Sequence, residues 1–401
     1  MDNLKRKLAA VVATGAILLF NATPALAGVS CTISGNGSDT DNDCDFTTSN
    51  TTTVTQNNVA VVVNDVDVDA DTGDNDANDN TGGDTEIDTG DIDTDVTVST
   101  AVNTNAASVS GGNNQDFDLE ISGNGTDSDN EVDVDITNTY DVTQDNDADV
   151  DNDVDVDADT GDNDANDNTG GDVSVTTGDI EANDGVQIST MANVNSAVVG
   201  TEDEEGTISA MITGNGSDSE NDIDLTTLND VDIDQENDLV VTNDVDVDAD
   251  TGDNEANDNT GGDVDVDTGD IDVDVTVDTV ANLNMAEVEG GNVGDVELEL
   301  DGNGTDSDNE IELDLTDTTD LDQDNDLDVD NDDIDVVEDT GDNDANDNTG
   351  GDTTVETGDA DGETTVSTSG NVNTFGDVDL DVDFDLDDLI DLLEDLLDLL
   401  S

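Results

Sequence analysis

The sequence predicts an all-β protein, a repetitive β-solenoid resembling a parallel β-helix, with a short amphipathic α-helix at its C-terminus. The first observation is strict alternation of acidic and apolar residues, as at 65–71 and 131–136. A period of two residues places apolar side chains on one face of a strand and acidic ones on the other. Clusters of Gly, Asn, Asp and Thr separate these segments, as turns require. Pro24 is the only proline, so none interrupts the later strands.

Four internal repeats are the second observation. The segment 65–84 recurs unchanged at 153–172, with the single difference Glu255 at 244–263, and more loosely at 333–352. Three shorter markers, Gly-Asn-Gly-Ser/Thr-Asp, Gln-x-Asn and Thr-Gly-Asp, recur in one order with a period of 88 to 91 residues. Units with a fixed period stack on one another in repeat proteins. The repeats span residues 31–119, 120–209, 210–297 and 298–376.

The small size of the apolar residues is the third observation. They are mostly Val, Ala, Ile and Leu, and the chain contains one Tyr, five Phe and no Trp. A β-sandwich fills a core about 10 Å thick with larger side chains, whereas small β-branched residues suit the narrow interior of a solenoid. Tandem β-sandwich repeats are the alternative, and a chain disordered without cations is a third. In a solenoid, Asn75, Asn78 and Asn80 can stack between coils as an amide ladder.

The N-terminus predicts export. Three basic residues at 5–7 precede an apolar run at 8–20, and a small-x-small cleavage site ends at Ala27. We therefore expect residues 1–27 to be a signal peptide and the rest to be secreted or held at the cell surface. The apolar run is too short to span a bilayer, and we expect no transmembrane segment after signal cleavage. Two cysteines in an exported chain predict one disulfide, Cys31–Cys44.

The charge of the chain restricts its chemistry. It has 111 acidic residues, no His, and only 3 basic residues, all within the expected signal peptide. Nucleic acid is excluded as a direct partner because it is also a polyanion. No catalytic pair stands out among so many acids, and sugar clefts normally contain aromatic platforms, so we do not expect an enzyme. Carboxylates in this number predict cations as partners.

The acidic residues of segment 65–84 and its copies are the candidate calcium ligands. This segment is more uniform between repeats than its flanks, which indicates a constraint beyond solvation. Ca²⁺ accepts irregular sets of oxygens at about 2.3–2.6 Å, and the lack of His disfavours soft metals. We predict multiple weak Ca²⁺ sites, with a solvated acidic face as the alternative. The candidate ligands are Asp67, Asp69, Asp71, Asp74, Asp76, Asp155, Asp157, Asp159, Asp162, Asp164, Asp246, Asp248, Asp250, Asp253, Asp335, Asp339, Asp342 and Asp344.

Two short motifs resemble parts of a known family. The Gln-x-Asn marker and the segment Gly73-Asp-Asn75-Asp-Ala77 resemble pieces of curlin-type repeats, which stack into β-solenoid fibres. The Gly-to-Asn step is one residue shorter here than in curlin. The chain is also similar to secreted Asp- and Asn-rich repeat proteins of bacterial surfaces. This resemblance implies a β-solenoid at a cell surface.

Residues 377–401 change from a strand pattern to a helical one. Alternation continues to Phe384, after which apolar residues recur every three or four positions. We expect this amphipathic helix to cap the open end of the solenoid, or to mediate self-association or contact with a protein partner. A membrane role is disfavoured because anionic lipid repels an acidic helix.

These patterns predict an exported acidic repeat protein that acts as a structural scaffold of the cell surface or extracellular matrix, ordered by Ca²⁺ or other cations. One alternative is an adhesin that binds glycan, mineral or neighbouring cells. Another is a salt-adapted structural protein without specific Ca²⁺ sites. The Gly-Asn-Gly-Ser/Thr markers are also N-glycosylation sequons, although a turn is the plainer interpretation. The asparagines concerned are Asn36, Asn124, Asn215 and Asn303.

Overall fold

The computed structural model describes residues 4–14, 28–109, 116–200, 206–288 and 294–376. These residues form strands and turns and include no helix, so the predicted all-β fold is confirmed for them. Within the same residues there is accordingly no helix that could span a bilayer. The expected cleavage site after Ala27 and the expected C-terminal helix at 377–401 lie outside the described residues.

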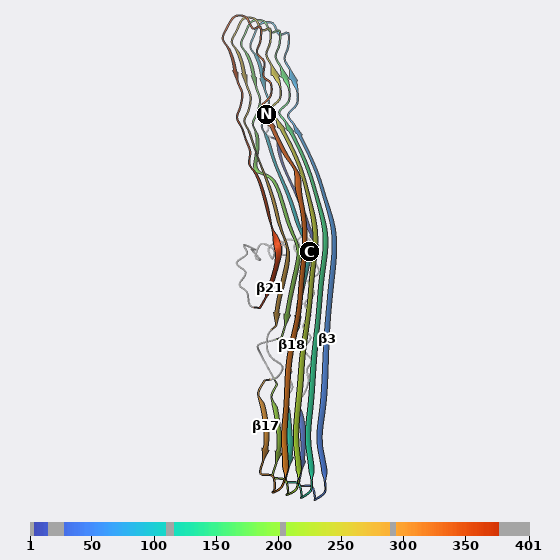
Figure 1. Cartoon of the computed structure of the whole chain (residues 1–401). Helices are drawn as coiled ribbons and strands as arrows, with labels where there is room; N and C mark the ends of the chain where they lie inside the picture. Colours follow the sequence, from blue (N-terminus) through green and yellow to red (C-terminus); the bar gives the residue numbers. More distant parts are fainter. Residues whose placement is uncertain (1–3, 15–27, 110–115, 201–205, 289–293, 377–401) are drawn as a thin grey trace.

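One repeat forms one complete coil of a long, flattened stack (Figure 1). In the first coil, β2 (Val29–Ser34) leads through a turn into β3 (Asp41–Asp71), which runs along most of the molecule. The chain turns back through β4 (Asn75–Asp76) and β5 (Thr85–Asp88) and returns along β6 (Ile92–Val109). At about 3.3 Å per residue, the 31 residues of β3 span roughly 100 Å.

The next three coils follow the same path. The second coil consists of β7 (Phe117–Ser122), β8 (Asp129–Asp159), β9 (Asn163–Asp164), β10 (Val173–Thr176) and β11 (Ile180–Val199). The third consists of β12 (Ile208–Thr213), β13 (Glu220–Asp250), β14 (Asn254–Glu255), β15 (Val264–Asp267) and β16 (Ile271–Val288). The fourth consists of β17 (Val296–Asp301), β18 (Asp308–Asp339), β19 (Thr353–Glu356), β20 (Ala360–Asp361) and β21 (Thr364–Phe375).

Hydrogen bonds join equivalent strands of successive repeats. The long strands form one parallel sheet in the order β18-β13-β8-β3. Its register follows the repeats, because Asp41 lies beside Asp129, which lies beside Glu220. Tandem β-sandwich domains would pair strands within each repeat, so that alternative is wrong. The stacked parallel sheets agree with the solenoid-like arrangement that the repeats predict.

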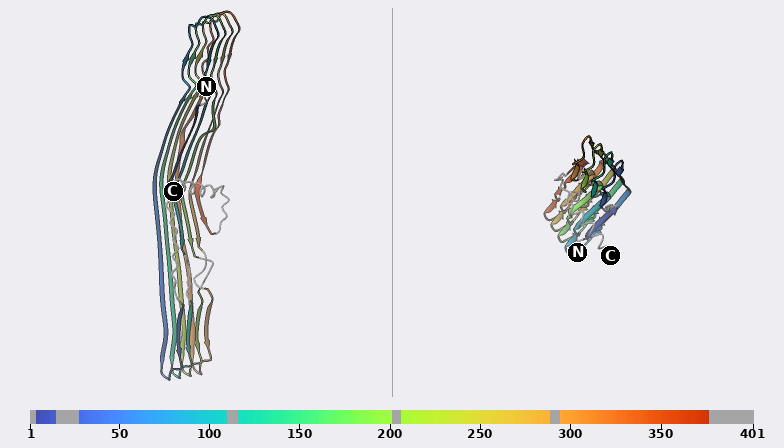
Figure 2. Two further views of the ribbon diagram at one scale, coloured as in Figure 1. Left: turned by 180° about the vertical axis from the view of Figure 1, so that it is seen from behind. Right: turned by 90° about the horizontal axis from the view of Figure 1, so that it is seen from below.

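The strands lie in two facing layers (Figure 2). Apolar side chains fill the thin space between the layers. The long strands form one layer, and the sheets that contain β6, β11 and β16 or β2, β7, β12 and β17 form the other. Alternation directs the apolar residues inward, so that Val154 and Val156 of β8 share a core cluster with Ile180 of β11. At the other end of the molecule, Leu119 and Val132 belong to a second cluster. Small β-branched side chains therefore fill a narrow space between the layers.

A disulfide closes the turn between β2 and β3 in the first coil. Cys31 and Cys44 are bonded, with their Cα atoms 6.3 Å apart. In the second coil the register places Leu119 beside Cys31 and Val132 beside Cys44. The disulfide thus stands where the next coil has an apolar contact, at the end of the stack that has fewest neighbours.

Asparagine side chains stack along the turns, as the sequence predicts. The Nδ2 of Asn75 donates to Oδ1 of Asn163 at 2.9 Å, and the Nδ2 of Asn163 donates to Oδ1 of Asn254 at 2.9 Å. The ladder that begins at Asn75 is therefore confirmed. The other two positions bond to the backbone of a neighbouring coil. The Oδ1 of Asn78 accepts the N–H of Asn166, and the Oδ1 of Asn168, which is the second-coil equivalent of Asn80, accepts the N–H of Asn80.

A larger amide network lies inside the stack. Asn146 of β8 and Asn195 of β11 are completely buried. The Nδ2 of Asn146 donates to Oδ1 of Asn195 at 2.8 Å across the two layers, and to Oδ1 of Asn237 at 3.0 Å in the next coil. The Nδ2 of Asn195 continues the column to Oδ1 of Asn284 at 3.0 Å. Since buried amides need partners, this network favours one register between coils.

One further strand lies at the N-terminal edge of the return sheet. Strand β1 (Leu4–Thr14) pairs in parallel with β6, with Leu4 beside Ile92 and Thr14 beside Val102. These residues belong to the segment that the sequence predicts to be a signal peptide. Removal of residues 1–27 would therefore uncover this edge of β6.

Candidate functional site

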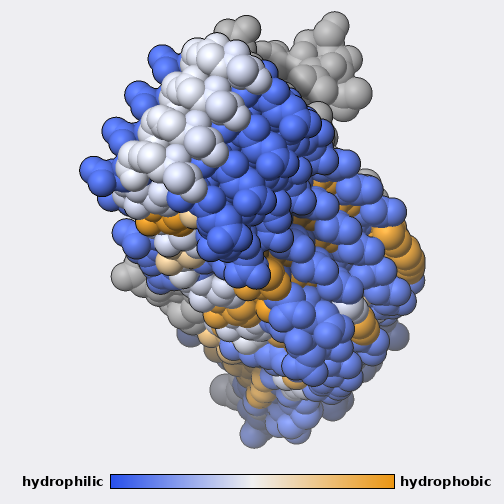
Figure 3. All heavy atoms as spheres, turned by 90° about the horizontal axis from the view of Figure 1, so that it is seen from above, coloured by the Kyte–Doolittle hydropathy of each residue, from blue (hydrophilic) through white to orange (hydrophobic). Residues whose placement is uncertain are grey.

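The outward face of the long strands carries many of the predicted cation ligands in rows. Asp67 is exposed, and its apolar neighbours in β3 are buried. Parallel pairing places Asp67 beside Asp155, Asp155 beside Asp246, and Asp246 beside Asp335. Neighbouring strands lie about 4.8 Å apart, so each carboxylate in the row has another carboxylate in the next coil. Figure 3 views the stack from one end and shows residues of similar hydropathy lined up in stripes across the coils.

The adjacent row contains three of the predicted ligands. Asp69 lies beside Asp157, which lies beside Asp248. The row ends at Val337, because the last coil has no acid at this position. The predicted ligand Asp339 lies two residues further along β18, beside Asp250.

Crowding of carboxylates changes their affinity for protons. The pKa of Asp157 is raised above its usual value by partial burial and by the charges of Asp248 and Asp69. The pKa of Asp250 is raised to about 6, chiefly by burial, although a hydrogen bond from Gly252 opposes the shift. A raised carboxyl pKa means that the folded protein disfavours the charged form. The rows are therefore sites where a positive ion would relieve electrostatic strain.

The predicted ligands at the end of the long strand bond to backbone groups. The Oδ1 of Asp159 accepts the N–H of Gly161 at 2.6 Å within one turn. The Oδ1 of Asp162 accepts the N–H of Asp253 in the next coil at 2.7 Å. Equivalent bonds within the turns are made by Asp71, Asp250 and Asp339, and equivalent bonds between coils by Asp74 and Asp253. These carboxylates shape the turns and join the coils.

A third row lies on the turn itself. Asp76 lies beside Asp164, and Glu255 of the third coil stands between Asp164 and Asp344. Burial, followed by the charges of Glu255 and Asp76, raises the pKa of Asp164. The Nδ2 of Asn78 donates to Oδ1 of Asp76 at 3.2 Å, so this row also takes part in local hydrogen bonding.

The carboxylates form extended rows and not closed clusters. Among the described residues, no group of three or more His, Cys, Asp or Glu side chains converges to hold a single metal ion. A cation above a row would instead contact carboxylates of adjacent coils. Oxygen ligands of this kind suit hard cations such as Ca²⁺. The geometry therefore fits many similar, weak positions better than a few enclosed sites.

Hydrogen bonds between coils explain much of the uniformity of segment 65–84 and of the Thr-Gly-Asp marker. The N–H of Asp172 donates to Oδ1 of Asp84 at 3.1 Å. In the marker, the N–H of Gly178 donates to Oγ1 of Thr89 at 3.1 Å. A side-chain acceptor at each of these positions is thus required for stacking. This requirement accounts for the turn residues without any bound ion, whereas the outward strand rows remain the better candidates for cation binding.

Two of the sequon asparagines have a structural role. Asn124 and Asn215 are each 4% exposed. The Oδ1 of Asn124 accepts the N–H of Asn36 at 3.0 Å, and its Nδ2 donates to Asn130 at 3.0 Å. The Nδ2 that a glycan would modify is therefore engaged inside the turn.

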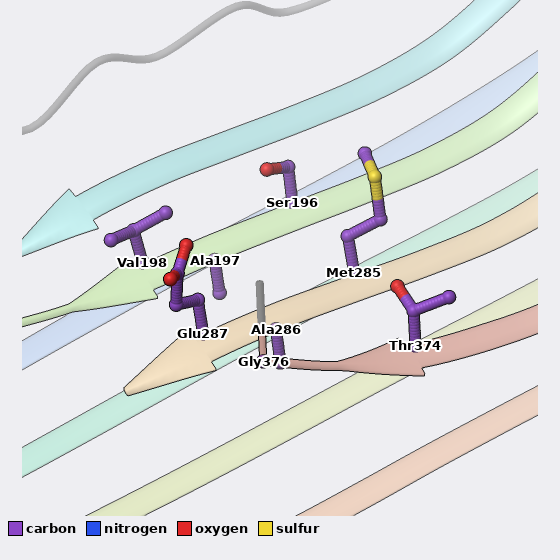
Figure 4. Close-up of a pocket in the computed structure, with 8 residues that line it drawn as sticks. All are labelled: Ser196, Ala197, Val198, Met285, Ala286, Glu287, Thr374 and Gly376. Carbon is purple, nitrogen blue, oxygen red and sulfur yellow. The ribbon is translucent and has the colours of Figure 1, made fainter. Parts of the chain in front are cut away.

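A small hollow lies where β11, β16 and β21 end (Figure 4). Its volume is about 160 Å³, and Glu287 is the one charged residue among those that line it. The other lining residues are Ser196, Ala197, Val198, Met285, Ala286, Thr374 and Gly376. A lone carboxylate in this setting provides neither a catalytic pair nor a cofactor cradle.

Comparison with protein-family models, with curated proteins and with solved structures gives no significant match to this chain.

Proposed function

We propose that this chain is an exported structural scaffold of the cell surface or extracellular matrix, and that cations bound along its acidic rows are needed for it to fold. The observation that carries the proposal is the stacking of carboxylates on carboxylates, exemplified by Asp67, Asp155, Asp246 and Asp335. Export and a surface location rest on the predicted signal peptide at 1–27.

Repulsion between like charges opposes the folding of this chain. Two unit charges about 4.8 Å apart repel by about 0.9 kcal/mol even at the dielectric constant of water. The chain carries 111 acidic residues, and its 3 basic residues all precede the expected cleavage site. A folded protein is stable by only roughly 5–15 kcal/mol, so repulsion summed over many pairs is decisive. Because no protein cation remains to offset it, mobile cations must do so.

Calcium is the cation that we favour for the outward rows. A divalent ion between two coils neutralises two carboxylates at once, and Ca²⁺ tolerates irregular oxygen ligands. The salt-adapted structural protein is the second candidate. It is favoured by the arrangement of the carboxylates in open rows along the long strands, because open rows require no particular ion. In that case, monovalent salt at high concentration would serve equally well.

Circular dichroism of the chain from residue 28 to residue 401 tests the proposal. Ca²⁺ is titrated at constant ionic strength, with NaCl and KCl series as controls. We expect β structure to appear at millimolar Ca²⁺ and to disappear on addition of a chelator. Equal order in NaCl or KCl alone would identify the salt-adapted protein. Full β structure in chelator at low ionic strength would contradict any need for cations.

A further inference from the structure

We propose that a second copy of this chain stacks end to end on the first, with β18 of one copy beside β3 of the next, and that β1 prevents this stacking until it is removed. This inference builds on the proposed scaffold function, and it identifies the partner as another copy of the same chain. It rests on four features of the two ends of the stack.

The first feature is the length of the unpaired edges. Within the described residues, β3 and β18 are the outermost strands of the long sheet, and each has a neighbour on one side only. Their edges are 31 and 32 residues long. Unpaired backbone of this length is a template for a further strand. Every strand of this sheet pairs in parallel with its equivalent in the next repeat. The free backbone groups of β18 are therefore arranged to pair with those of β3 in another copy.

The second feature is the loss of charge in the first coil. The segment 47–64 of β3 contains no acidic residue, whereas its equivalents in the other three coils all contain several. Val59, Val61 and Val63 instead face outward, with 75%, 71% and 65% of their surfaces exposed. This row carries no charge that would repel the carboxylates of an adjacent coil.

The register shows that a junction between two copies would avoid some of the repulsion between carboxylates. Inside the stack, acid meets acid at this level, as where Asp147 lies beside Asp238 and Asp238 beside Asp326. If β18 of another copy continued the same register, Asp326, Asp328 and Asp330 would lie beside Val59, Val61 and Val63. The junction between copies would thus resemble the internal junction of β3 with β8, where valines lie beside Asp147, Asp149 and Asp151, and would lack the repulsion of the row Asp147-Asp238-Asp326.

The third feature is the direction of the amide ladders. In the interior column, the Nδ2 of Asn58 donates to Oδ1 of Asn146, and the Nδ2 of Asn237 donates to Oδ1 of Asn325. Columns that begin at Asn42, Asn64 and Asn75 run in the same direction. Each of these asparagine columns therefore presents an acceptor at the first coil and a donor at the last. The glutamine column runs the opposite way, since the Nε2 of Gln144 donates to Oε1 of Gln56 and the Nε2 of Gln323 to Oε1 of Gln235, so its two ends are complementary too. End-to-end stacking would bring these complementary ends together.

The fourth feature is a glycine in the first coil. A Cβ on Gly125 would lie 2.5 Å from the backbone carbon of Gly37, so close stacking requires glycine in the second coil. Gly37 has the same place in the first coil, but nothing lies within 4 Å of the corresponding position, and its φ is not in the positive range. The first coil thus keeps a residue that only a further coil would require.

Strand β1 occupies part of the surface that the second copy would need. In the last coil, β21 pairs with β16, with Val275 beside Thr364. The equivalent neighbour of a second copy would lie along β6 from Val96 onward. Residues 4–14 already pair with β6 between Ile92 and Val102. The chain with its N-terminal segment therefore blocks one layer of the junction, and the chain without it does not.

Stacking of unlike ends does not close on itself, so the expected product is a linear polymer. Sedimentation velocity and electron microscopy of chains 1–401 and 28–401 test this in the cation condition that gives full β structure. We expect chain 28–401 to form linear polymers as its concentration rises and chain 1–401 to remain monomeric. A folded monomer of chain 28–401 at all concentrations overturns the stacking. Equal polymerisation of both chains overturns the role of β1.

Substitutions on the outward face identify the surface involved. Replacing all three valines (Val59→Asp, Val61→Asp and Val63→Asp) restores the pattern of the second coil, which has Asp147, Asp149 and Asp151 at these positions. The cation condition that gives full β structure offsets the added repulsion with the second coil, circular dichroism checks that the variant is folded, and we expect the concentration needed for assembly to rise at least about tenfold. The matched control is Val240→Asp in the third coil, which adds charge in the row of Val61 away from the junction. Equal assembly of the triple variant and the control contradicts the proposed surface.

A crosslink tests the register directly. Chains with Val61→Cys are mixed with chains carrying Asp328→Cys and treated with a short thiol-reactive crosslinker. We expect crosslinked dimers from the mixture and none from either variant alone. Failure of chain 28–401 to fold in any cation would instead contradict the proposed function, so the two hypotheses fail in different ways.

Discussion

At the scale of single residues, asparagine forms hydrogen-bonded ladders in two places, along the turns and in the buried interior. The turn ladder at Asn75 was predictable because Asn clusters mark turns. The interior column was not, because a polar residue on the inward face runs against the alternation rule. The signal in the sequence was the Gln-x-Asn marker, which recurs in every repeat. In the second repeat its Gln144 and Asn146 occupy inward positions of β8. An amide can serve there because it both donates and accepts, so identical residues can bond along a stack.

Asn195→Ala tests the interior column. Asn195 donates to Asn237 and Asn284 and accepts from Asn105, with distances of 3.0 Å. The substitution leaves these buried partners unsatisfied, so we expect the free energy of unfolding to fall by roughly 2–3 kcal/mol. The control is Asn57→Ala, at an exposed position on the outward face of β3. Urea unfolding in the ordering cation measures both, and equal stability of the two variants would contradict a role for the column.

Gly125→Ala and Gly37→Ala form a matched pair at one position of the repeat. In the second coil the added Cβ would lie 2.6 Å from the carbonyl oxygen of Gly37, so coils must separate. In the first coil it would meet nothing within 4 Å. We expect the thermal midpoint to fall by several degrees for Gly125→Ala and to remain unchanged for Gly37→Ala in chain 1–401. A similar loss in both would mean that the turn, and not the stacking, requires glycine.

At the scale of elements, alternation and repeat boundaries revealed strands and stacking but not strand length. Strands in globular proteins are usually 3–10 residues long, and a repeat of this size is usually divided among several of them. Here β3 alone has 31 residues, so one repeat makes a single coil. Such a strand is possible because the stacked coils satisfy its backbone throughout, and because Val and Asp continue their alternation across positions that look like turns. Asn64-Asp65, for example, lies within β3.

The acidic rows act as elements, and Asp157→Asn tests them. Asp157 lies between Asp69 and Asp248, and its loss of charge relieves repulsion with both. Without divalent cations, we expect the variant to reach full β structure at a lower NaCl concentration than the parent chain, with little difference in concentrated salt, which screens the charges. Asp118→Asn is the control, because Asp118 lies between Ser30 and Ser209. Equal stabilisation by both substitutions would mean that overall charge, and not the rows, opposes folding.

At the scale of the whole molecule, fold and charge are encoded by the same alternation. Apolar positions of the long strands fill the space between the two layers, and the acidic positions that alternate with them face outward. Stacking places apolar residues of successive coils beside one another and acidic residues beside one another. Each added coil therefore increases both the buried apolar surface and the repulsion between carboxylates. Composition alone predicted that cations are needed. The distribution of charge along the stack, with an acid-free segment only in the first coil, became meaningful once the register was known.

Acidification without divalent cations tests this balance. The carboxyl pKa values of Asp155, Asp157 and Asp250 are raised in the folded protein, that of Asp250 to about 6. The folded state therefore binds protons more tightly than the unfolded state, and the free energy of unfolding rises as the pH falls from about 7 towards 5. Circular dichroism of chain 28–401 in chelator should therefore show β structure increasing as the pH falls.

Saturating Ca²⁺ should reverse the trend, because protons then displace a bound ion that stabilises the fold. The comparison needs only one chain and two buffers. Stability that falls on acidification in chelator would show that the charged rows favour folding by themselves. Stability that rises on acidification in both buffers would show that protons, but not Ca²⁺, relieve the repulsion between coils.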